Sequence, residues 1–156
     1  MDFSKAFDKV CHKKLLSKLD FYGVRSNTLQ WFSCFLEGCQ QCVVVDGAQS
    51  SYIDVLSGVP QGSVTGPTLF LVYINDLPEY VDCTVHLFAD DTVMYLTIHS
   101  EEQCAQLQVD LDMLQVWEED WLMEFNPEKC EILRISRKKT QSSRTTTLSM
   151  AKFLDL

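Results

Sequence analysis

Basic side chains are scarce in this sequence, and their scarcity limits the functions that it can carry. The 156 residues contain 13 Lys and Arg against 22 Asp and Glu, which gives a net charge of −9 at pH 7. Proteins that bind nucleic acid by themselves usually present a basic stripe, because affinity for the phosphate backbone comes largely from lysine and arginine. The composition therefore argues against a free-standing nucleic-acid binder.

Long apolar runs are also missing. The longest, Leu69 to Ile74, is far shorter than the about 18 residues that indicate a membrane-spanning helix. The N-terminus is charged rather than apolar, so the sequence predicts no signal peptide and no membrane association. The 7 cysteines, an odd number without a regular framework, indicate reduced thiols in an intracellular protein. Nuclear and cytoplasmic locations both stay open.

Cysteine and histidine give little sign of a metal site. Cys34, Cys39 and Cys42 match a ferredoxin-type ligand spacing. Against this reading, Cys34 lies in an apolar helical pattern, Cys42 opens a valine-rich strand, and a cluster needs more ligands on one loop system. The 3 histidines form no spaced set with the cysteines, so free thiols are the favoured interpretation.

Helical and strand patterns alternate along the chain, which is long enough for one domain with its own core. Apolar spacing predicts helices over residues 13–22, 26–38, 67–77 and 100–121, and β-branched runs predict strands over residues 42–45, 51–56, 84–89, 92–98 and 130–135. Asp46-Gly47 is a hairpin turn signal, Ser26 and the Ser100–Gln103 pair are predicted helix caps, and Asn126-Pro127 is the predicted end of the last helix. This mixed order predicts a single α+β domain over residues 1–156.

The stretch from His86 to Leu96 carries two adjacent carboxylates, Asp90 and Asp91, between two strand-like apolar runs. Asp-Asp in such a place is turn chemistry, so the sequence predicts a β-hairpin with both carboxylates at its tip. Two like charges about 4 Å apart at an effective dielectric of about 20 repel by on the order of 4 kcal/mol, which water screens or a cation offsets. For this pair taken by itself, a plain surface turn is the favoured reading; only the rest of the chain favours a cation site.

Four motifs follow one another along the chain. Asp2-Phe3-Ser4-Lys5-Ala6-Phe7-Asp8 comes first, Gly58-Val59-Pro60-Gln61-Gly62-Ser63 with Gly66-Pro67 second, and Phe88-Ala89-Asp90-Asp91 third. The fourth combines Trp121 with Asn126-Pro127 and Lys129-Cys130, and Lys152-Phe153-Leu154 follows it. In this order and at this spacing, the motifs resemble the palm of a reverse transcriptase, most closely that of the non-LTR (LINE-like) retrotransposons. The resemblance covers nearly all of the chain.

The resemblance implies a polymerase palm-like fold: a small antiparallel sheet with the Asp-Asp hairpin at its centre, backed by the helices over residues 67–77 and 100–121. The implied function is RNA-directed DNA polymerase activity, with an RNA template, a DNA primer and deoxynucleotides as partners. The fingers that should precede Met1 and the thumb that should follow Leu156 are expected to be missing. The chain is therefore expected to be an incomplete domain that binds nucleic acid weakly and is inactive alone.

By the same resemblance, Asp2, Asp90 and Asp91 would hold two Mg²⁺ ions and form the catalytic centre with Lys129, which would stand near the triphosphate. The chemistry agrees, because nucleotide transfer is an in-line phosphoryl transfer and Mg²⁺ favours one or two carboxylates plus substrate phosphates. The residues expected to contact nucleotide or template are Phe3, Phe7, Pro60, Gln61 and Gly62. Of these, Phe7 would lie beneath the incoming sugar and exclude a 2′-hydroxyl.

Each of these residues also has an ordinary structural reading. Asp2 is then a frayed terminal residue, Phe7 part of the core, Gln61 a turn residue and Lys129 a solvated surface charge. Asp8 is expected to be structural and to bond nearby backbone. The rival function comes from a different class: a non-catalytic remnant, or a domesticated fragment that binds another protein through an exposed apolar face.

Overall fold

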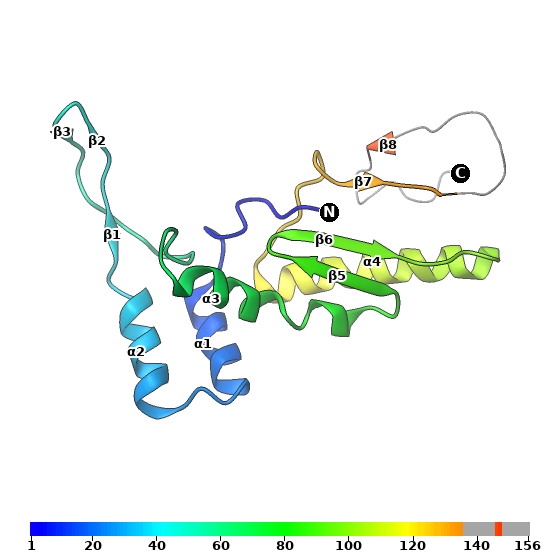
Figure 1. Cartoon of the computed structure of the whole chain (residues 1–156), viewed down its shortest axis with the longest axis horizontal. Coiled ribbons are helices and arrows are strands. Elements are labelled where there is room, and N and C mark those ends of the chain that lie inside the picture. Colours follow the sequence, from blue (N-terminus) through cyan, green and yellow to red (C-terminus); the bar gives the residue numbers. More distant parts are fainter. Residues whose placement is uncertain (136–145, 148–156) are drawn as a thin grey trace. The chain divides into compact units, whose positions relative to one another are not determined.

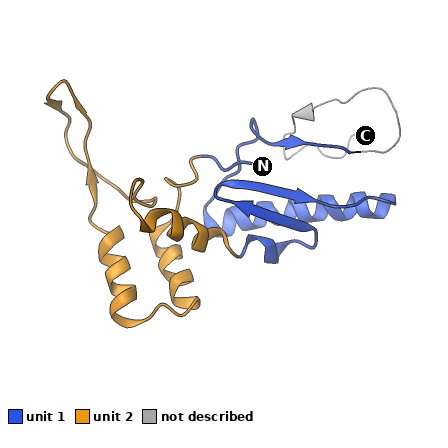
Figure 2. Ribbon diagram, in the orientation of Figure 1, with its two compact units in different colours: residues 1–4, 76–156 blue, residues 5–75 orange. Residues whose placement is uncertain are grey.

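The structure, a computed structural model, describes residues 1–135 and 146–147. The chain forms two compact units, which are coloured separately in Figure 2. Unit 1 contains Met1–Ser4 and Asp76–Leu156, and unit 2 contains Lys5–Asn75. Helices are combined with small antiparallel sheets, so the α+β class is confirmed (Figure 1). None of the described helices combines the length and the apolar composition that crossing a membrane requires.

Unit 2 is built on three helices, α1 (His12–Phe21), α2 (Ser26–Leu36) and α3 (Thr65–Ile74). α3 is rich in buried side chains, and its last turn receives a lysine from α1. Lys18 is only 4% exposed, donates a hydrogen bond to the main-chain carbonyl of Tyr73, and lies 5.1 Å from the centroid of the Tyr73 ring. A cation is stabilised at the C-terminal end of a helix, so this contact fixes α1 against α3.

A hairpin arm follows α2 along the chain (Figure 1). Its short strands are β1 (Gln40–Gln41), β2 (Val44–Val45), β3 (Ala48–Gln49) and β4 (Ile53–Asp54). β2 pairs with β3, and β1 pairs with β4, both antiparallel. Asp46 (φ 50°) and Gly47 (φ 81°) make the two-residue turn, and both have the positive φ that a type I′ hairpin turn requires. The Asp-Gly turn prediction is therefore confirmed.

Unit 1 carries the central hairpin and the longest helix. Its elements are η1 (Leu77–Tyr80), β5 (Thr84–Phe88), β6 (Asp91–Tyr95), α4 (Glu101–Trp121), β7 (Glu131–Ile132) and β8 (Thr146–Thr147). β5 pairs with β6, and β7 pairs with β8. At the start of α4, the side chain of Gln103 accepts a hydrogen bond from the backbone N–H of Ser100 at 3.2 Å, as the predicted capping box requires.

Aromatic rings form the core of unit 1. Trp117 from α4 is fully buried, and Phe125 and Phe3 are 1% and 2% exposed. The Phe3 ring stacks on Phe125 with 4.4 Å between centroids and lies 5.8 Å from the Trp117 ring. Aromatic rings bury large areas and dominate core energetics. Phe3 therefore holds the short segment Met1–Ser4 against α4, although this segment is far from α4 in sequence.

Two predicted signals for helix ends are misplaced. Arg25, not Ser26, is the N-cap of α2, and no side chain makes a capping hydrogen bond there. α4 ends at Trp121, as the predicted range 100–121 has it, but the Asn126-Pro127 stop signal lies beyond its end, because Leu122 adopts a left-handed backbone with φ 55° and reverses the chain. The reversal buries Met123, which is 4% exposed, and so core packing outweighs the proline signal downstream.

The β5–β6 hairpin was predicted to lie at the centre of a small antiparallel sheet, but it has fewer neighbouring strands than this prediction requires. Within the described part of the chain it is a two-stranded sheet, extended by the isolated bridge between Asp2 and Asp91. The predicted strand over residues 130–135 is reduced to β7. The Lys152-Phe153-Leu154 motif lies outside the described residues.

A buried carboxylate on α4 holds the chain just before β5. Asp110 is 2% exposed and accepts hydrogen bonds from the backbone N–H groups of Cys83 at 2.8 Å and Asp82 at 3.2 Å, and from Nε2 of Gln106 at 3.0 Å. Burial by itself would raise the pKa of Asp110, but the hydrogen bond from the Cys83 side chain, together with those from the Asp82 N–H, Gln106 and the Cys83 N–H, outweighs burial and lowers it. Burial and the facing carboxylate raise the pKa of the Cys83 thiol to about 12.

Candidate active site

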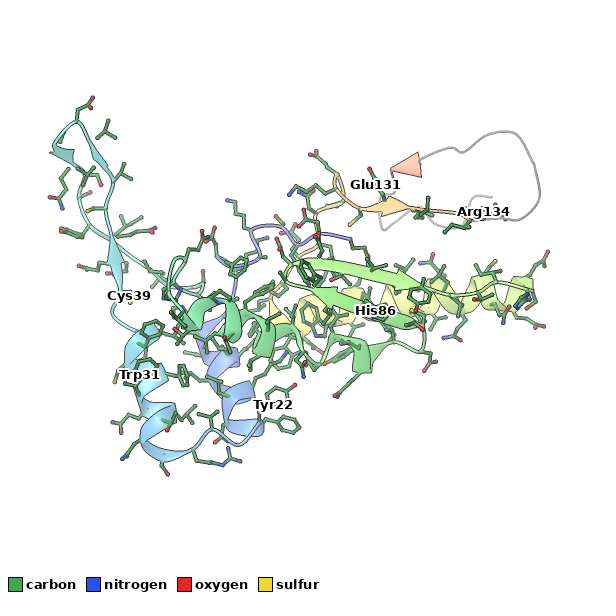
Figure 3. All side chains as sticks on the ribbon, viewed as in Figure 1. Tyr22, Trp31, Cys39, His86, Glu131 and Arg134 are labelled. Carbon is green, nitrogen blue, oxygen red and sulfur yellow. The ribbon has the colours of Figure 1, made fainter. Side chains whose placement is uncertain are left out.

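Asp90 and Asp91 lie at the end of the β5–β6 hairpin. Phe88 pairs with Asp91, so Ala89 and Asp90 are the two turn residues and Asp91 opens β6. Ala89 has φ 52°, which L-residues rarely adopt and which costs on the order of 1–2 kcal/mol. One face of the hairpin is exposed and carries His86, labelled in Figure 3, whose Nε2 lies 3.1 Å from the hydroxyl oxygen of Tyr95.

Asp2 lies beside this hairpin end. It forms an antiparallel bridge with Asp91, and the neighbouring Thr92 N–H donates to the carbonyl of Met1 at 2.9 Å. Directly opposed residues of an antiparallel pair carry side chains on the same face, with Cα atoms roughly 4.5–5.5 Å apart. The bridge therefore brings the first predicted carboxylate next to the pair at the hairpin tip.

Lys129 supplies a cation to this carboxylate group. Its Nζ donates to Oδ2 of Asp2 at 2.7 Å. The hydrogen bond that Lys129 donates to Asp2 is the largest cause that raises the pKa of Lys129, and the negative charges of Asp2, Asp90 and Asp91 raise it further. Each of the three predicted carboxylates thus acts electrostatically on Lys129 within unit 1.

The Asn126–Cys130 turn positions Lys129. The N–H of Asn126 donates to the carbonyl of Asp2 at 2.8 Å, and the N–H groups of Lys129 and Cys130 donate to the carbonyl of Asn126 at 3.0 and 3.1 Å. The side chain of Asn126 also accepts from the N–H of Glu128 at 3.1 Å. The turn is therefore anchored to the backbone of the same residue whose side chain its lysine binds.

Carboxylate oxygens such as those of Asp2, Asp90 and Asp91 are ligands that a hard divalent cation prefers. The three carboxylates do not, however, form a complete metal site by themselves. Among residues 1–135 and 146–147, no three His, Cys, Asp or Glu side chains are grouped closely enough to hold a metal. Mg²⁺ needs only one or two carboxylates, because waters and substrate phosphates complete its octahedron. The Lys129 ammonium next to Asp2 shows that this position already stabilises positive charge.

The second group of predicted site residues lies in unit 2, where the Pro60-Gln61-Gly62 loop runs along residues 7–10. The N–H of Val59 donates to the carbonyl of Phe7, and the N–H of Gly58 donates to the carbonyl of Val10, both at 2.8 Å. Nε2 of Gln61 donates to Oδ1 of Asp8 at 3.1 Å. The loop and the Phe7 segment are therefore one hydrogen-bonded unit.

The two predicted phenylalanines have different surroundings. Phe7 is half-buried, and its ring lies 4.6 Å from that of Phe70 on α3. Phe3 is 2% exposed inside the core of unit 1, so any contact of this residue with a substrate has to come from its backbone. A substrate role for either residue stays a prediction.

The sequence did not indicate His12 as a residue that supports the site, and it predicted only bonds to nearby backbone for Asp8. Nε2 of His12 lies 2.7 Å from the carbonyl oxygen of Gly58, and so it fixes the start of the loop. Asp8 bonds the Gln61 side chain and, through its carbonyl, the hydroxyl of Ser57 at 2.8 Å. No local pattern in the sequence marks these contacts, because the partners are about fifty residues apart.

Replacing Gly58 with Ala is expected to lower the free energy of unfolding by about 2–3 kcal/mol. A Cβ at this position would lie 2.9 Å from the carbonyl oxygen of Phe7, a backbone atom that cannot move aside cheaply, and Gly58 has φ +93°. Gly23 is the matched control, since it has the same φ of +93° but no atom within 4 Å of an added Cβ. Urea unfolding of both variants separates the clash from backbone strain, and equal losses would refute close packing at Gly58.

The sequence of this chain is similar to those of known proteins. Residues 1–151 match the family described as reverse transcriptase (RNA-dependent DNA polymerase). Similar proteins include the "RNA-directed DNA polymerase from mobile element jockey" of Drosophila melanogaster, 37% identical over 139 residues, and its Drosophila funebris counterpart, 34% identical over 139 residues. The "Probable RNA-directed DNA polymerase from transposon BS" of Drosophila melanogaster is 31% identical over 144 residues.

Each of these matches covers 83% of this chain and 15% of the relative, so the chain spans a small part of the length of the proteins it resembles. The relatives belong to mobile elements, and the predicted resemblance to LINE-like reverse transcriptases is confirmed. Since the family match extends over nearly the whole sequence, this chain belongs to the reverse transcriptase (RNA-dependent DNA polymerase) family.

Proposed function

We propose that this chain is the catalytic palm of an RNA-directed DNA polymerase from a LINE-like mobile element. The observation that carries the proposal is the bridge between Asp2 and Asp91, beside Asp90 at the hairpin turn. Asp2 and Asp91, about ninety positions apart in sequence, pair with each other in this bridge, and Lys129 bonds the Asp2 carboxylate. A plain surface turn would not require Asp2, Asp91 and Lys129 to lie together.

The proposed reaction is the in-line attack of a primer 3′-hydroxyl on the α-phosphorus of a deoxynucleotide. Two Mg²⁺ ions, when bound, neutralise charge on the attacking and leaving oxygens. Asp2 and Asp90 would hold these ions, and Asp91 would support them as the third carboxylate. Lys129 is proposed to offset the charge of the triphosphate and to donate a proton to the leaving pyrophosphate.

Substrate selection is assigned to unit 2. Phe7 is the proposed barrier to a 2′-hydroxyl, because a bulky ring beneath the sugar leaves no room for that group. Pro60, Gln61 and Gly62 are proposed to line the nucleotide and template pocket. The hydrogen bond from Gln61 to Asp8 and the backbone bonds between Val59 and Phe7 support a loop whose position is fixed relative to the Phe7 ring.

RNA-templated primer extension tests the proposal. A polypeptide of the relatives' length that carries these residues is expected to incorporate deoxynucleotides only when Mg²⁺, template and primer are all present. Residues 1–156 assayed alone are expected to give no incorporation above a buffer blank, since their net charge of −9 opposes binding of a phosphate backbone. Absence of incorporation by the longer polypeptide would refute the function, and incorporation by the short chain would refute the expected dependence on further segments.

One feature favours the rival function, a protein-binding fragment. The hairpin arm exposes a run of apolar side chains, with Val44 62%, Tyr52 61% and Ile53 57% exposed. A two-stranded hairpin is marginally stable in water by itself, and exposed apolar surface of this kind often contacts protein. The primer-extension assay separates the two functions, because a protein-binding remnant needs neither the carboxylates nor the metal.

A further inference from the structure

We infer that Lys129 occupies the cation position of the Asp2 carboxylate in the metal-free chain, so that a divalent ion must displace this ammonium before Asp2 can bind it. The inference rests on the proposed metal site and adds a role for Lys129 that precedes nucleotide binding. Its basis is direct: Nζ of Lys129 lies 2.7 Å from Oδ2 of Asp2, a normal charge-assisted hydrogen bond.

The two partners differ in how freely they can leave the ion pair. The Asp2 side chain is 19% exposed, and its residue is bridged to Asp91 and bonded through its carbonyl to Asn126. The Lys129 side chain is 62% exposed and sits on a flexible four-carbon stem. The carboxylate is therefore the fixed partner, and the ammonium is the one that moves when a second cation competes.

Replacing the Lys129 ammonium with a divalent ion is electrostatically favourable. Asp2, Asp90 and Asp91 carry three formal negative charges, of which one ammonium offsets one, and each of the three acts electrostatically on Lys129. A divalent ion supplies twice the charge in a smaller volume and binds carboxylate oxygens directly. Removing the ammonium makes the cluster more negative and frees Oδ2 of Asp2, so metal affinity has to rise.

Displacement does not release Lys129 from the site. Its backbone N–H remains bonded to the carbonyl of Asn126, and Asn126 remains bonded to the carbonyl of Asp2. These bonds are independent of the side-chain ion pair. The ammonium therefore stays tethered close to the carboxylates and is free to pair with an anion, which makes metal binding a step that prepares Lys129 for the triphosphate.

Titration of residues 1–156 with Mn²⁺, followed by the electron paramagnetic resonance signal of the free ion, tests this exchange. Lys129→Met is expected to tighten Mn²⁺ binding by about 2- to 5-fold, the range expected for losing an exposed competing ion pair. Lys129→Arg keeps the competing charge and is expected to stay close to the wild type. Lys13→Met, at an exposed position of α1 in unit 2, is the control for net charge and is expected to change affinity by less than the Lys129→Met variant.

A second pair of variants locates the effect. In an Asp2→Asn background, Lys129→Met is expected to bring no further gain, because the carboxylate for which the two cations compete is gone. Equal Mn²⁺ affinity in the wild type and Lys129→Met, or an equal gain from Lys13→Met, would overturn the exchange while leaving the metal site intact. Failure of every variant to bind Mn²⁺ while circular dichroism shows native helix would overturn the metal site and the exchange together.

Discussion

Replacing Asp90 with Asn in a polypeptide of the relatives' length is expected to lower RNA-templated primer extension by on the order of 10³-fold. Asp90 is a turn residue of the β5–β6 hairpin, beside Asp91 and within electrostatic reach of Lys129. Asn has the same shape as Asp but carries no charge, so it weakens the hold on the ions that stabilise the transition state. A loss of about 4 kcal/mol of that stabilisation corresponds to the stated factor.

The matched control is Asp46→Asn, which removes a carboxylate from the other hairpin turn. Asp46 has φ 50°, and Asn tolerates this left-handed backbone well, so the turn is expected to keep its geometry. Extension rates of the wild type and both variants, measured at saturating nucleotide and Mg²⁺, should show a loss for Asp90→Asn alone. Retained activity in Asp90→Asn would exclude this residue as a metal ligand.

Local signals account for the parts of the fold that the sequence predicts well. Asp46-Gly47 specifies its turn through backbone preference, and the Ser100–Gln103 capping box specifies the start of α4 through hydrogen bonds within a few residues. The apolar residues of α4 have helical spacing, and of Leu107, Leu111, Leu114, Trp117 and Trp121 the middle three are buried and the outer two half-buried. In each case the determining atoms are close together in sequence.

Features fixed by distant partners were much harder to predict. The Ser26 cap is wrong although serine is a good capping residue, and the Asn126-Pro127 stop signal lies beyond the end of α4 because Leu122 reverses the chain toward the core. The contact of Lys129 with Asp2 joins residues 127 positions apart, and no periodicity encodes it. The motifs could name both residues as site candidates through a family resemblance, but not the ion pair between them.

Asp110 shows the same limit in a residue that the motifs did not mention. Its position in the apolar stripe of α4 looks unfavourable for a charge, because an unpaired buried carboxylate is costly. The structure removes the cost with hydrogen bonds from two backbone N–H groups, at Asp82 and Cys83, and from the side chain of Gln106. The carboxylate thereby joins α4 to the start of the hairpin that carries Asp90 and Asp91.

Replacing Asp110 with Asn is expected to lower the free energy of unfolding by about 3 kcal/mol at pH 7. The change removes the charge and puts a donor where backbone donors already point, and hydrogen bonds to a charged group contribute about 1.5–3 kcal/mol each. Asp112→Asn, at an exposed position of the same helix, is the control and is expected to change stability by less than about 0.5 kcal/mol. Urea unfolding followed by tryptophan fluorescence gives both values, and a loss in Asp110→Asn no greater than in Asp112→Asn would contradict the structural role.

Lowering the pH is expected to remove the difference in the free energy of unfolding between the wild type and Asp110→Asn. The pKa of Asp110 is lowered in the folded chain from its usual 3.8. The unfolded state therefore binds the proton more readily, and the contribution of the carboxylate is fully present above about pH 4 and is lost as the pH falls through the folded pKa. Unfolding curves at several pH values should show a constant gap between the two proteins from pH 7 to about pH 5, followed by convergence at lower pH. A gap that closes as the pH rises would mean that the folded chain favours the protonated acid, and would exclude the hydrogen bonds as the reason for its burial.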